Sequence, residues 1–338
     1  MTTPANPHTT LILSRTQSED LVTMAEVITA VEGAFGDMAC GTAAQPPAVS
    51  MSLPSGSGMF LVMPALAGRQ GLASVKLLAD VPDNAGRHLP TQRSVLMLVS
   101  QDTGAPVAII HGQIPTRIRT AAASAVASKH LSRPDSNVLG LVGAGALAVD
   151  HVRAHLAVRP INRVVVWSRS EATVNHFAEQ IAHNHPGLTV EGAPAPQAVF
   201  VKADIICTLT PSRESIVQGA WFGPGQHINA VGAPPRSDHR EVDGAGIARS
   251  SLFIDNRATA LHESGDVLLA IAEGAISENH PMTELGAVIA GRAPGRTAPD
   301  QITLFNSVGL GIQDLVIGRL MVDRARARGI GLEIDLSS

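Results

Sequence analysis

Two patterns of apolar positions divide the chain into an early and a late region. Residues 21–37 repeat apolar side chains at helical spacing, which predicts a helix with one buried face, and Ser18-Glu19-Asp20 before them is typical of a helix start. From residue 44 to residue 110, short apolar runs are separated by Gly, Pro, Asn and Asp. Runs at residues 59–63, 72–78 and 95–99 predict strands, and residues 102–104 predict a hairpin turn. The early region is therefore predicted to be β-rich.

Strands and helices alternate in the late region. Residues 120–129 predict an alanine-rich helix, and apolar runs predict strands at residues 139–142, 163–167, 204–208, 228–231 and 252–255. This alternation is typical of an α/β fold with a Rossmann-type, doubly wound parallel sheet. A long helix at residues 311–328 is expected to pack back on the early region. We predict a β-rich α+β domain from residues 1–118 plus 312–338, and a Rossmann-type domain from residues 119–311.

Composition narrows the classes of function. Hydrophobic residues make up 45% and charged residues 16% of the 338-residue chain, which is typical of a globular protein with a large core. A net charge of −4 and an aromatic content of 3% argue against a nucleic-acid partner. Because the chain has neither a secretory signal pattern nor an apolar run of membrane-spanning length, we expect a cytoplasmic protein without a membrane partner. Cys40 and Cys207 are expected to be buried thiols.

A glycine motif follows the strand predicted at residues 139–142. The sequence from Gly143 to Ala148 reads Gly-x-Gly-x-x-Ala and leads into a predicted helix. Gly143 allows a tight turn, and Gly145 allows the backbone to approach a phosphate closely, while the helix N–H groups favour an anion. The motif predicts a site for a nucleotide pyrophosphate. Its residues are Gly143, Ala144, Gly145, Ala146 and Leu147.

The end of the next predicted strand indicates which nucleotide is bound. NAD enzymes usually carry Asp or Glu there to hold the ribose 2′-hydroxyl group, whereas this chain reads Ser168-Arg169-Ser170. Hydroxyl groups and an arginine suit the 2′-phosphate of NADP. We expect NADP(H), with NAD(H) as the alternative. The alternative for Arg169 is a solvated loop residue.

Several ordered motifs resemble the ornithine cyclodeaminase and mu-crystallin family of NAD(P)-dependent proteins from about residue 11 to residue 328. They lie at residues 74–76, 112–124, 141–148, 228–233, 263–266 and 303–310. The resemblance implies a homodimer in which the early region and the C-terminal helix bind substrate and make the subunit contact. It also implies small-molecule substrates, either amino acids or their cyclic imines. It further implies cofactor contacts, which we assign to Thr208, Leu209, Val231, Gly232 and Gly309.

Lys76 and Arg119 match the family's basic groups that hold a substrate carboxylate. The expected position of Arg119 at a helix N-terminus would add a guanidinium group to the helix dipole. Lys76 lies in an apolar predicted strand, where an unpaired ammonium is costly, so it needs an anionic partner. If burial lowers its pKa, Lys76 could also relay a proton. The alternative for both residues is a structural salt bridge. Weaker candidates for the pocket are Thr91, Gln92 and Ser307.

Two departures from the family pattern narrow the reaction. A third carboxylate-binding arginine follows a Gln-Pro pair in many members, but Ala48 stands there in this chain. Cyclodeaminases carry an aspartate where this chain has Pro234, which cannot exchange a side-chain proton. We therefore expect NAD(P)H-dependent reduction of a cyclic imine carboxylate, Δ1-pyrroline-2-carboxylate to L-proline or its six-membered homologue to L-pipecolate. The alternatives are ornithine cyclodeaminase or alanine dehydrogenase activity, or a binding protein without turnover.

Acidic and histidine residues in the late region do not form a metal motif. His262, Glu263 and Asp266 lie near one another, but no His-x-x-x-His spacing accompanies them, so we predict no metal site. The segment from Ser264 to Asp266 is instead expected to cap a following helix. His227 and His239 flank a predicted strand and are expected to be exposed.

Overall fold

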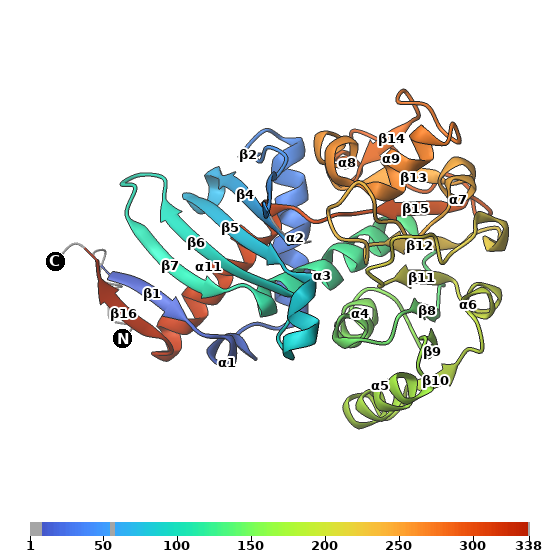
Figure 1. Ribbon diagram of the computed structural model, residues 1–338, viewed down its shortest axis with the longest axis horizontal. Coiled ribbons are helices and arrows are strands. Elements are labelled where there is room, and N and C mark those ends of the chain that lie inside the picture. The colour runs from blue at the N-terminus through green and yellow to red at the C-terminus, as the bar shows by residue number, and fades with distance from the viewer. Residues whose placement is uncertain (1–8, 55–57, 337–338) are drawn as a thin grey trace. The chain divides into compact units, whose positions relative to one another are not determined.

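The computed structural model describes residues 9–54 and 58–336, and the chain divides into two compact units. Unit 1 comprises Met1–Arg119 and Leu310–Ser338, and unit 2 comprises Thr120–Gly309. Each unit contains its own β-sheet (Figure 1). The α/β fold class is confirmed, because the sheet of unit 2 is parallel throughout and that of unit 1 is mixed.

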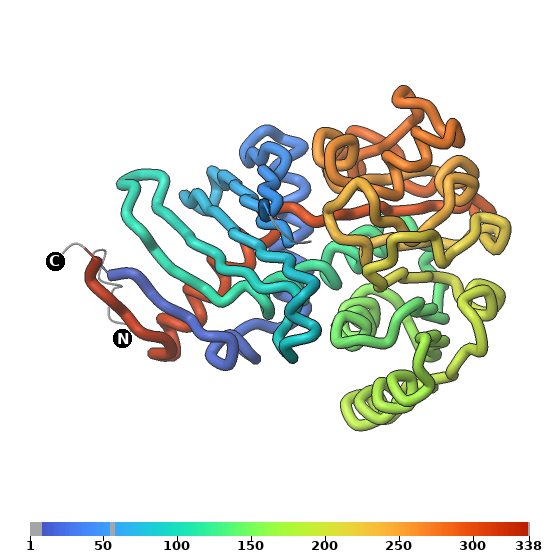
Figure 2. The backbone as a smooth tube through the Cα atoms, viewed as in Figure 1, coloured from blue at the N-terminus to red at the C-terminus, as the bar shows by residue number. Residues whose placement is uncertain are grey.

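Unit 1 is built on a sheet with the strand order β16-β1-β7-β6-β5-β4-β2, and β3 also pairs with β4. The chain-terminal strands β1 and β16 pair antiparallel, and the trace follows them side by side (Figure 2). Helix α11 packs against α2 and against β4, β5 and β6. The strands are β1 (Thr9–Leu13), β2 (Ala43–Ala44), β3 (Val49–Ser52), β4 (Met59–Ala67), β5 (Leu72–Asp80), β6 (Gln92–Ser100), β7 (Pro106–His111) and β16 (Leu332–Asp335). The helices are α1 (Arg15–Ser18), α2 (Met24–Ala39) and α11 (Gly311–Arg328), with 3₁₀ turns η1 (Gly68–Gln70) and η2 (Pro82–Arg87).

The contact between α11 and the sheet depends on small residues. A side chain at Gly318 would begin 2.8 Å from Leu96 Cδ2, so glycine allows the helix to lie directly on β6. The buried positions of β5 alternate with less buried ones, and Lys76 belongs to the buried set. One face of the sheet is thus covered by α11, and Lys76 projects from that face.

The predicted start of the first long helix is wrong. The chain forms the short helix α1 after Ser14, turns at Asp20, which has a φ of 57°, and only then begins α2. Thr23 is the N-cap of α2, where it accepts a hydrogen bond from the backbone N–H of Glu26, and Glu26 binds back to the N–H of Thr23. This reciprocal pair satisfies two N–H groups at the helix start, which Ser18 cannot do.

Unit 2 is a parallel sheet with the strand order β10-β9-β8-β11-β12-β15-β13-β14. The order reverses between β8 and β11, and in such sheets ligands bind at the carboxyl ends of the strands next to this point. Its strands are β8 (Val138–Val142), β9 (Arg163–Trp167), β10 (Thr189–Gly192), β11 (Ile205–Thr208), β12 (His227–Ala230), β13 (Ser251–Ile254), β14 (Met282–Glu284) and β15 (Thr303–Asn306). Its helices are α4 (Ala146–Leu156), α5 (Glu171–Asn184), α6 (Pro196–Lys202), α7 (Gly244–Arg249), α8 (Arg257–Glu263), α9 (Gly265–Ala272) and α10 (Leu285–Ile289), with the 3₁₀ turn η3 (Gly219–Trp221). The boundary between the units falls within α3 (Gln113–Leu131).

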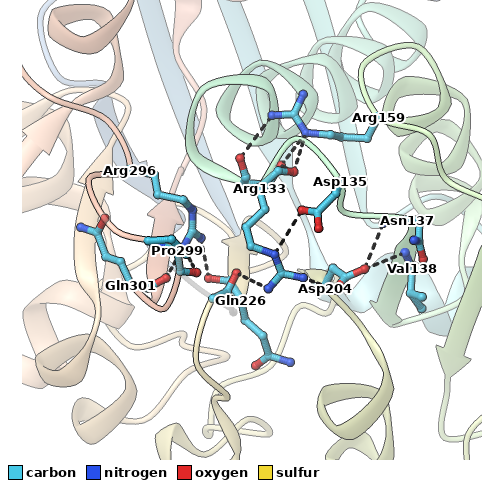
Figure 3. A network of polar contacts seen from close by, with 12 residues as sticks. Arg133, Asp135, Asn137, Val138, Arg159, Asp204, Gln226, Arg296, Pro299 and Gln301 are labelled. Atoms are coloured by element: carbon cyan, nitrogen blue, oxygen red, sulfur yellow. Dashed lines mark hydrogen bonds and ion pairs between the residues drawn. The ribbon is translucent and has the colours of Figure 1, made fainter.

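Arginines hold together the amino ends of the unit 2 strands (Figure 3). Arg133 donates a 2.8 Å hydrogen bond to Asp204, whose second oxygen accepts from the backbone N–H groups of Asn137 and Val138. Arg159 donates to the carbonyl groups of Ser128 and Lys129 in the last turn of α3 and to that of Ser132 just after it. Arg296 donates hydrogen bonds to the carbonyl groups of Leu131, at the end of α3, and Gln226, just before β12. These contacts fix the end of the sheet opposite the predicted nucleotide site.

Three predictions about burial are wrong. His227 is fully buried between Thr303 and Asn229, and His239 is also buried, because each ring finds a hydrogen-bond partner. Cys40 is exposed because it lies at the C-cap of α2, whereas Cys207 is buried as predicted.

Residues 9–54 and 58–336 contain no cluster of three or more residues suited to a metal ion. In the same part of the chain, no helix combines the length and apolarity needed to cross a membrane.

Candidate active site

The Lys76 ammonium is paired with a carboxylate that the sequence analysis missed. Its Nζ lies 3.0 and 3.1 Å from the two carboxylate oxygens of Asp314, in the first turn of α11. Both side chains are 1% exposed. Burial lowers the pKa of Lys76 to about 8, while the charge of Asp314 opposes this shift and that of Arg119 adds to it. The anionic partner that the sequence required is therefore present within unit 1.

Arg119 lies beside this pair. Its Nη1 donates a 3.1 Å hydrogen bond to Gln313, and its Nε lies 3.8 Å from Asp314. The expected position at a helix N-terminus is wrong, because α3 begins at Gln113 and Arg119 belongs to its second turn. The first turn of α11 provides the nearby helix start instead, through Gln313 and Asp314. The structure thus brings Lys76 and Arg119 together around one carboxylate.

The weaker pocket candidates are not part of this group. Thr91 and Gln92 are exposed, and in the described part of unit 1 neither side chain forms a hydrogen bond. Ser307 belongs to unit 2 and is buried, where it donates a 2.8 Å hydrogen bond to Asp255. The N–H of Gly309 donates to the same oxygen at 3.0 Å. Ser307 and Gly309 therefore organise the segment that follows β15.

The glycine turn has the local geometry that a dinucleotide requires. Gly143 has a φ of 119°, and its N–H donates to the carbonyl of Trp167 at the end of β9. Gly145 is the N-cap of α4, and it provides no side-chain cap for the first N–H groups of that helix. A Cβ at Gly145 would meet no atom within 4 Å, so space is open beside the helix start. Ala144, Ala146 and Leu147 complete the turn. These residues fit a pyrophosphate group.

The side chains expected to contact the ribose of the cofactor lie directly after the next strand, β9. Arg169 is exposed after β9, and across residues 9–54 and 58–336 its guanidinium makes no hydrogen bond or ion pair. Ser170 is the N-cap of α5, where its hydroxyl oxygen accepts from the N–H of Thr173 at 3.4 Å. Ser168 directly follows the last residue of β9 and is half-buried. Arg169 is thus available to an anionic group, whereas Ser170 is engaged with its own helix.

Glu241 organises the ends of β11 and β12, and no sequence motif indicated this role. Its carboxylate accepts four hydrogen bonds, from the Thr208 hydroxyl, the Thr210 N–H and hydroxyl, and the Gly232 N–H. A Cβ at Gly232 would lie 2.1 Å from the Thr210 nitrogen, so only glycine allows this approach. Burial raises the pKa of Glu241 to about 7. Two of the proposed cofactor residues, Thr208 and Gly232, are therefore held by one buried carboxylate.

Asp266 holds the backbone at Glu241 in place. Its Oδ1 accepts the backbone N–H groups of Glu241 and Val242, and its Oδ2 accepts from Asn306 at the end of β15. Ser264 is the N-cap of α9, as predicted, and its hydroxyl also donates to Asn306. These bonds tie the strand ends of unit 2 together without a metal ligand set in the described residues.

A model of the ornithine cyclodeaminase/mu-crystallin family matches residues 8–329. The chain belongs to this family. A Δ1-pyrroline-2-carboxylate reductase of Bacillus cereus is 31% identical over 96% of this chain and 99% of its own length. Among solved structures, the Δ1-pyrroline-2-carboxylate reductase of Thermococcus litoralis in complex with NADH and L-proline has a TM-score of 0.92 and 34% identity, covering 96% of this chain and 100% of its own.

An archaeal alanine dehydrogenase dimer with bound NAD has a TM-score of 0.90 and 32% identity, covering 97% of this chain and 99% of its own. Reductases and a dehydrogenase with different substrates thus share one fold with this protein. The chain is an oxidoreductase of the class that acts on C=N and CH–NH bonds with a nicotinamide cofactor.

Proposed function

We propose that this protein reduces a cyclic imine carboxylate, with Δ1-pyrroline-2-carboxylate giving L-proline as the principal reaction and the six-membered homologue giving L-pipecolate. The observation that carries the proposal is the buried group of Lys76, Arg119 and Asp314. Two cations face one carboxylate there, so the group has a net charge of +1 and suits one more anion. A substrate with a single carboxylate next to the C=N carbon provides that anion.

The residues of the chain then have separate tasks. A bound reduced nicotinamide supplies the hydride, whereas the protein binds, orients and shields the substrate. Arg119 and Lys76 hold the planar carboxylate and so fix the face that the imine presents. Because the pKa of Lys76 lies near 8, its ammonium also suits transfer of a proton to the imine nitrogen near neutral pH. Asp314 stabilises that ammonium in the absence of substrate.

Two positions argue against the other reactions of the family. Pro234 has no side-chain proton, and its carbonyl accepts the N–H of Arg236 at 2.7 Å, so it has no group for an amino nitrogen. Ala48 is buried and adds no charge to the carboxylate site. Imine reduction needs neither group, because the imine nitrogen can be protonated before the hydride is transferred. We therefore favour it over cyclodeamination and over reductive amination of pyruvate.

We further propose NADP(H) as the preferred cofactor, with NAD(H) accepted. Arg169 supports this preference, because it is exposed and makes no hydrogen bond or ion pair within the described chain. The two solved relatives contain NADH and NAD, which favours the alternative. Use of NADH in preference to NADPH would overturn the proposed preference and leave the proposed reaction intact.

A homodimer through unit 1 is the proposed assembly. The sheet face opposite α11 carries an apolar patch, defined as Val62, Pro64, Leu66, Val75, Leu77, Val95 and Met97. Val75 is in register with Pro64 and Met97, and Leu77 with Val62 and Val95, so the patch is continuous across three strands. Leu77 is 37% and Met97 39% exposed. An apolar sheet face of this extent favours contact with a second copy of the chain. The archaeal alanine dehydrogenase that this chain resembles is a dimer.

The test of the proposed reaction is direct. Purified protein should oxidise NADPH or NADH in the presence of Δ1-pyrroline-2-carboxylate or Δ1-piperideine-2-carboxylate, followed by the loss of absorbance of the reduced nicotinamide. Pyruvate with ammonia, and ornithine, serve as the competing substrates. Turnover of ornithine or pyruvate without turnover of either imine would overturn the proposal. Tight cofactor binding without any turnover would favour the non-catalytic alternative.

A further inference from the structure

The side-chain amide of Gln313 has a fixed orientation beside Lys76 and Arg119. Its Oε1 accepts a 3.1 Å hydrogen bond from Arg119 Nη1 and a 3.3 Å hydrogen bond from the backbone N–H of Leu310. Both partners can only donate. Exchanging the amide oxygen and nitrogen would place an NH₂ group against two donors, so the orientation is settled by the network. The Nε2 group must therefore project away from Arg119 and Leu310.

This Nε2 group has no acceptor among residues 9–54 and 58–336, although Gln313 is 0% exposed. The Nε of Arg119 is likewise buried without a hydrogen bond, since Asp314 Oδ1 lies 3.8 Å away. Native proteins seldom leave two neighbouring buried donors unsatisfied, because each has lost its hydrogen bonds to water. An external acceptor would satisfy both donors.

The local charges indicate what that acceptor is. Lys76 and Arg119 are the cations of this group, and Asp314 is the only carboxylate that forms an ion pair with them in the described chain. β4 contains no charged residue, and Asp37 of α2 pairs with Arg69 instead. One positive charge is left over, next to two N–H groups without acceptors. A planar anion with two acceptor oxygens matches both the charge and the donors.

We infer that the Gln313 carboxamide is a third donor to the substrate carboxylate, next to Lys76 and Arg119. This inference rests on the proposed function, because it assigns the same carboxylate. The neutral amide takes the place of the arginine that is missing at Ala48. It contributes a hydrogen bond without a further charge, so the group keeps its single excess positive charge. Gln313 therefore favours a monocarboxylate, to which its Nε2 donates directly.

Two substitutions separate donation from charge. Gln313→Met removes the amide without adding a charge. Gln313→Glu removes the NH₂ group and adds a negative charge. If Gln313 donates to the carboxylate, Gln313→Met should raise KM for Δ1-pyrroline-2-carboxylate about 10-fold or more, with kcat and the NADH dissociation constant changed less than about 3-fold. The effect of Gln313→Glu should be larger. The carboxylate-free imine Δ1-pyrroline should be reduced with an unchanged kcat/KM, which a general disturbance of the fold would not produce.

Gln45→Met is the matched control. Gln45 Oε1 accepts the backbone N–H of Ile312 at the same helix start, but it does not contact Lys76 or Arg119 in the described structure. Its KM should stay within about 2-fold of the wild-type value. An unchanged KM in Gln313→Met, or an equal loss of activity on both imines, would overturn the inference.

Binding separates this inference from the proposed reaction. Calorimetric titration of the NADH complex with pyrrole-2-carboxylate tests carboxylate binding without turnover. Weaker binding in Gln313→Met would support the inference even if no imine were reduced. Equal affinity in wild type and variant, or no binding by the wild type, would overturn it.

Discussion

The Thr208 hydroxyl lies 2.6 Å from Oε2 of Glu241, the same oxygen that accepts the N–H of Gly232. One carboxylate thus fixes the ends of two neighbouring strands. In Glu241→Gln one end of the side chain becomes a donor and opposes a backbone N–H, which costs about 1–3 kcal/mol. We expect weaker NADH binding by about 10-fold and a lower melting temperature, measured by fluorescence titration and calorimetry. Glu273→Gln, at an exposed ion pair with Arg240, is the control. NADH affinity equal to that of the wild type would contradict this role.

Ionisation of the same carboxylate predicts a pH dependence. The pKa of Glu241 is raised to about 7, so its ionised form predominates above that pH. The ionised form accepts all four hydrogen bonds from the two loops. NADH affinity of the wild type should therefore fall as the pH decreases from 8 to 6, and that of Glu241→Gln should stay flat. Parallel pH profiles for the two proteins would assign the dependence to another group.

Asp314→Asn should shift the pH range in which substrate binds. Lys76 is protonated below its pKa of about 8, so kcat/KM for the imine should fall as the pH rises through that value in the wild type. Asp314 raises this pKa by its charge. Without that charge the ammonium loses its proton at lower pH, and the fall in kcat/KM should begin at lower pH as well. Asp323→Asn, on the exposed side of α11, should leave the profile unchanged.

Arg169→Ala tests the cofactor preference. If the guanidinium binds the 2′-phosphate, the variant should bind NADPH about 10-fold or more weakly and bind NADH as before, measured by fluorescence titration. Ser168→Asp offers the reciprocal change, because a carboxylate there would hold the ribose hydroxyl and repel the phosphate. An equal loss of affinity for both cofactors in Arg169→Ala would show that the side chain does not read the phosphate.

Buried histidines should make unit 2 sensitive to acid. His151 and His155 accept hydrogen bonds from Ser124 and Ser128, and burial lowers their pKa values to about 3 and about 4. Each ring is neutral when folded and gains a proton on unfolding below about pH 6.5. Stability should therefore be lost as the pH falls from 6.5 towards 4, by up to about 1.4 kcal/mol per pH unit for each histidine.

His155→Gln should flatten this dependence, measured by urea unfolding between pH 7.5 and pH 4.5. The variant will be less stable at neutral pH, so the slope against pH rather than the absolute stability is the relevant quantity. His183→Gln changes an exposed histidine of α5 and is the control. A slope identical to that of the wild type in His155→Gln would contradict the assignment.

Met97→Lys should dissociate the proposed dimer. Removing a charged ammonium from water within the apolar patch is costly, so the variant should elute as a monomer in size-exclusion chromatography with light scattering. Val201→Lys is matched in chemistry, because Val201 is 78% exposed in unit 2. It should elute as the wild type does. A Met97→Lys protein of unchanged mass would exclude this face as the subunit contact.

Local pattern predicted most of the elements, and its successes and failures have physical reasons. Residues 163–167 and 311–328 coincide with β9 and α11, because a β-branched run and a long helical periodicity are strong local signals. The start of α2 was misplaced because Ser18 and Thr23 both resemble N-caps, and only the reciprocal bond of Thr23 with Glu26 decides between them. β16 was missed because its four residues become a strand only by pairing with β1.

Candidate site residues could be named only where a motif or a family pattern marked them. The glycine turn depends on local geometry, so its residues could be named in advance. Asp314 could not be named, because no local signal links it to Lys76. The need for a counter-ion to a buried Lys76 was clear from the sequence, but no pattern indicated which acidic residue provides it. Glu241 lies between regular elements and has no periodicity that marks its burial.

The Lys76–Asp314 pair also constrains how the protein is made. The two residues are 238 positions apart, and β1 pairs with β16 across almost the whole chain. Unit 1 therefore cannot finish folding until the ribosome has released α11, whereas unit 2 is continuous and can fold earlier during synthesis. Until then Lys76 has no counter-ion, and its strand cannot be buried without cost. A chain that stops before Asp314 should thus have a folded unit 2 and an incomplete sheet in unit 1, exposed to chaperones and proteases.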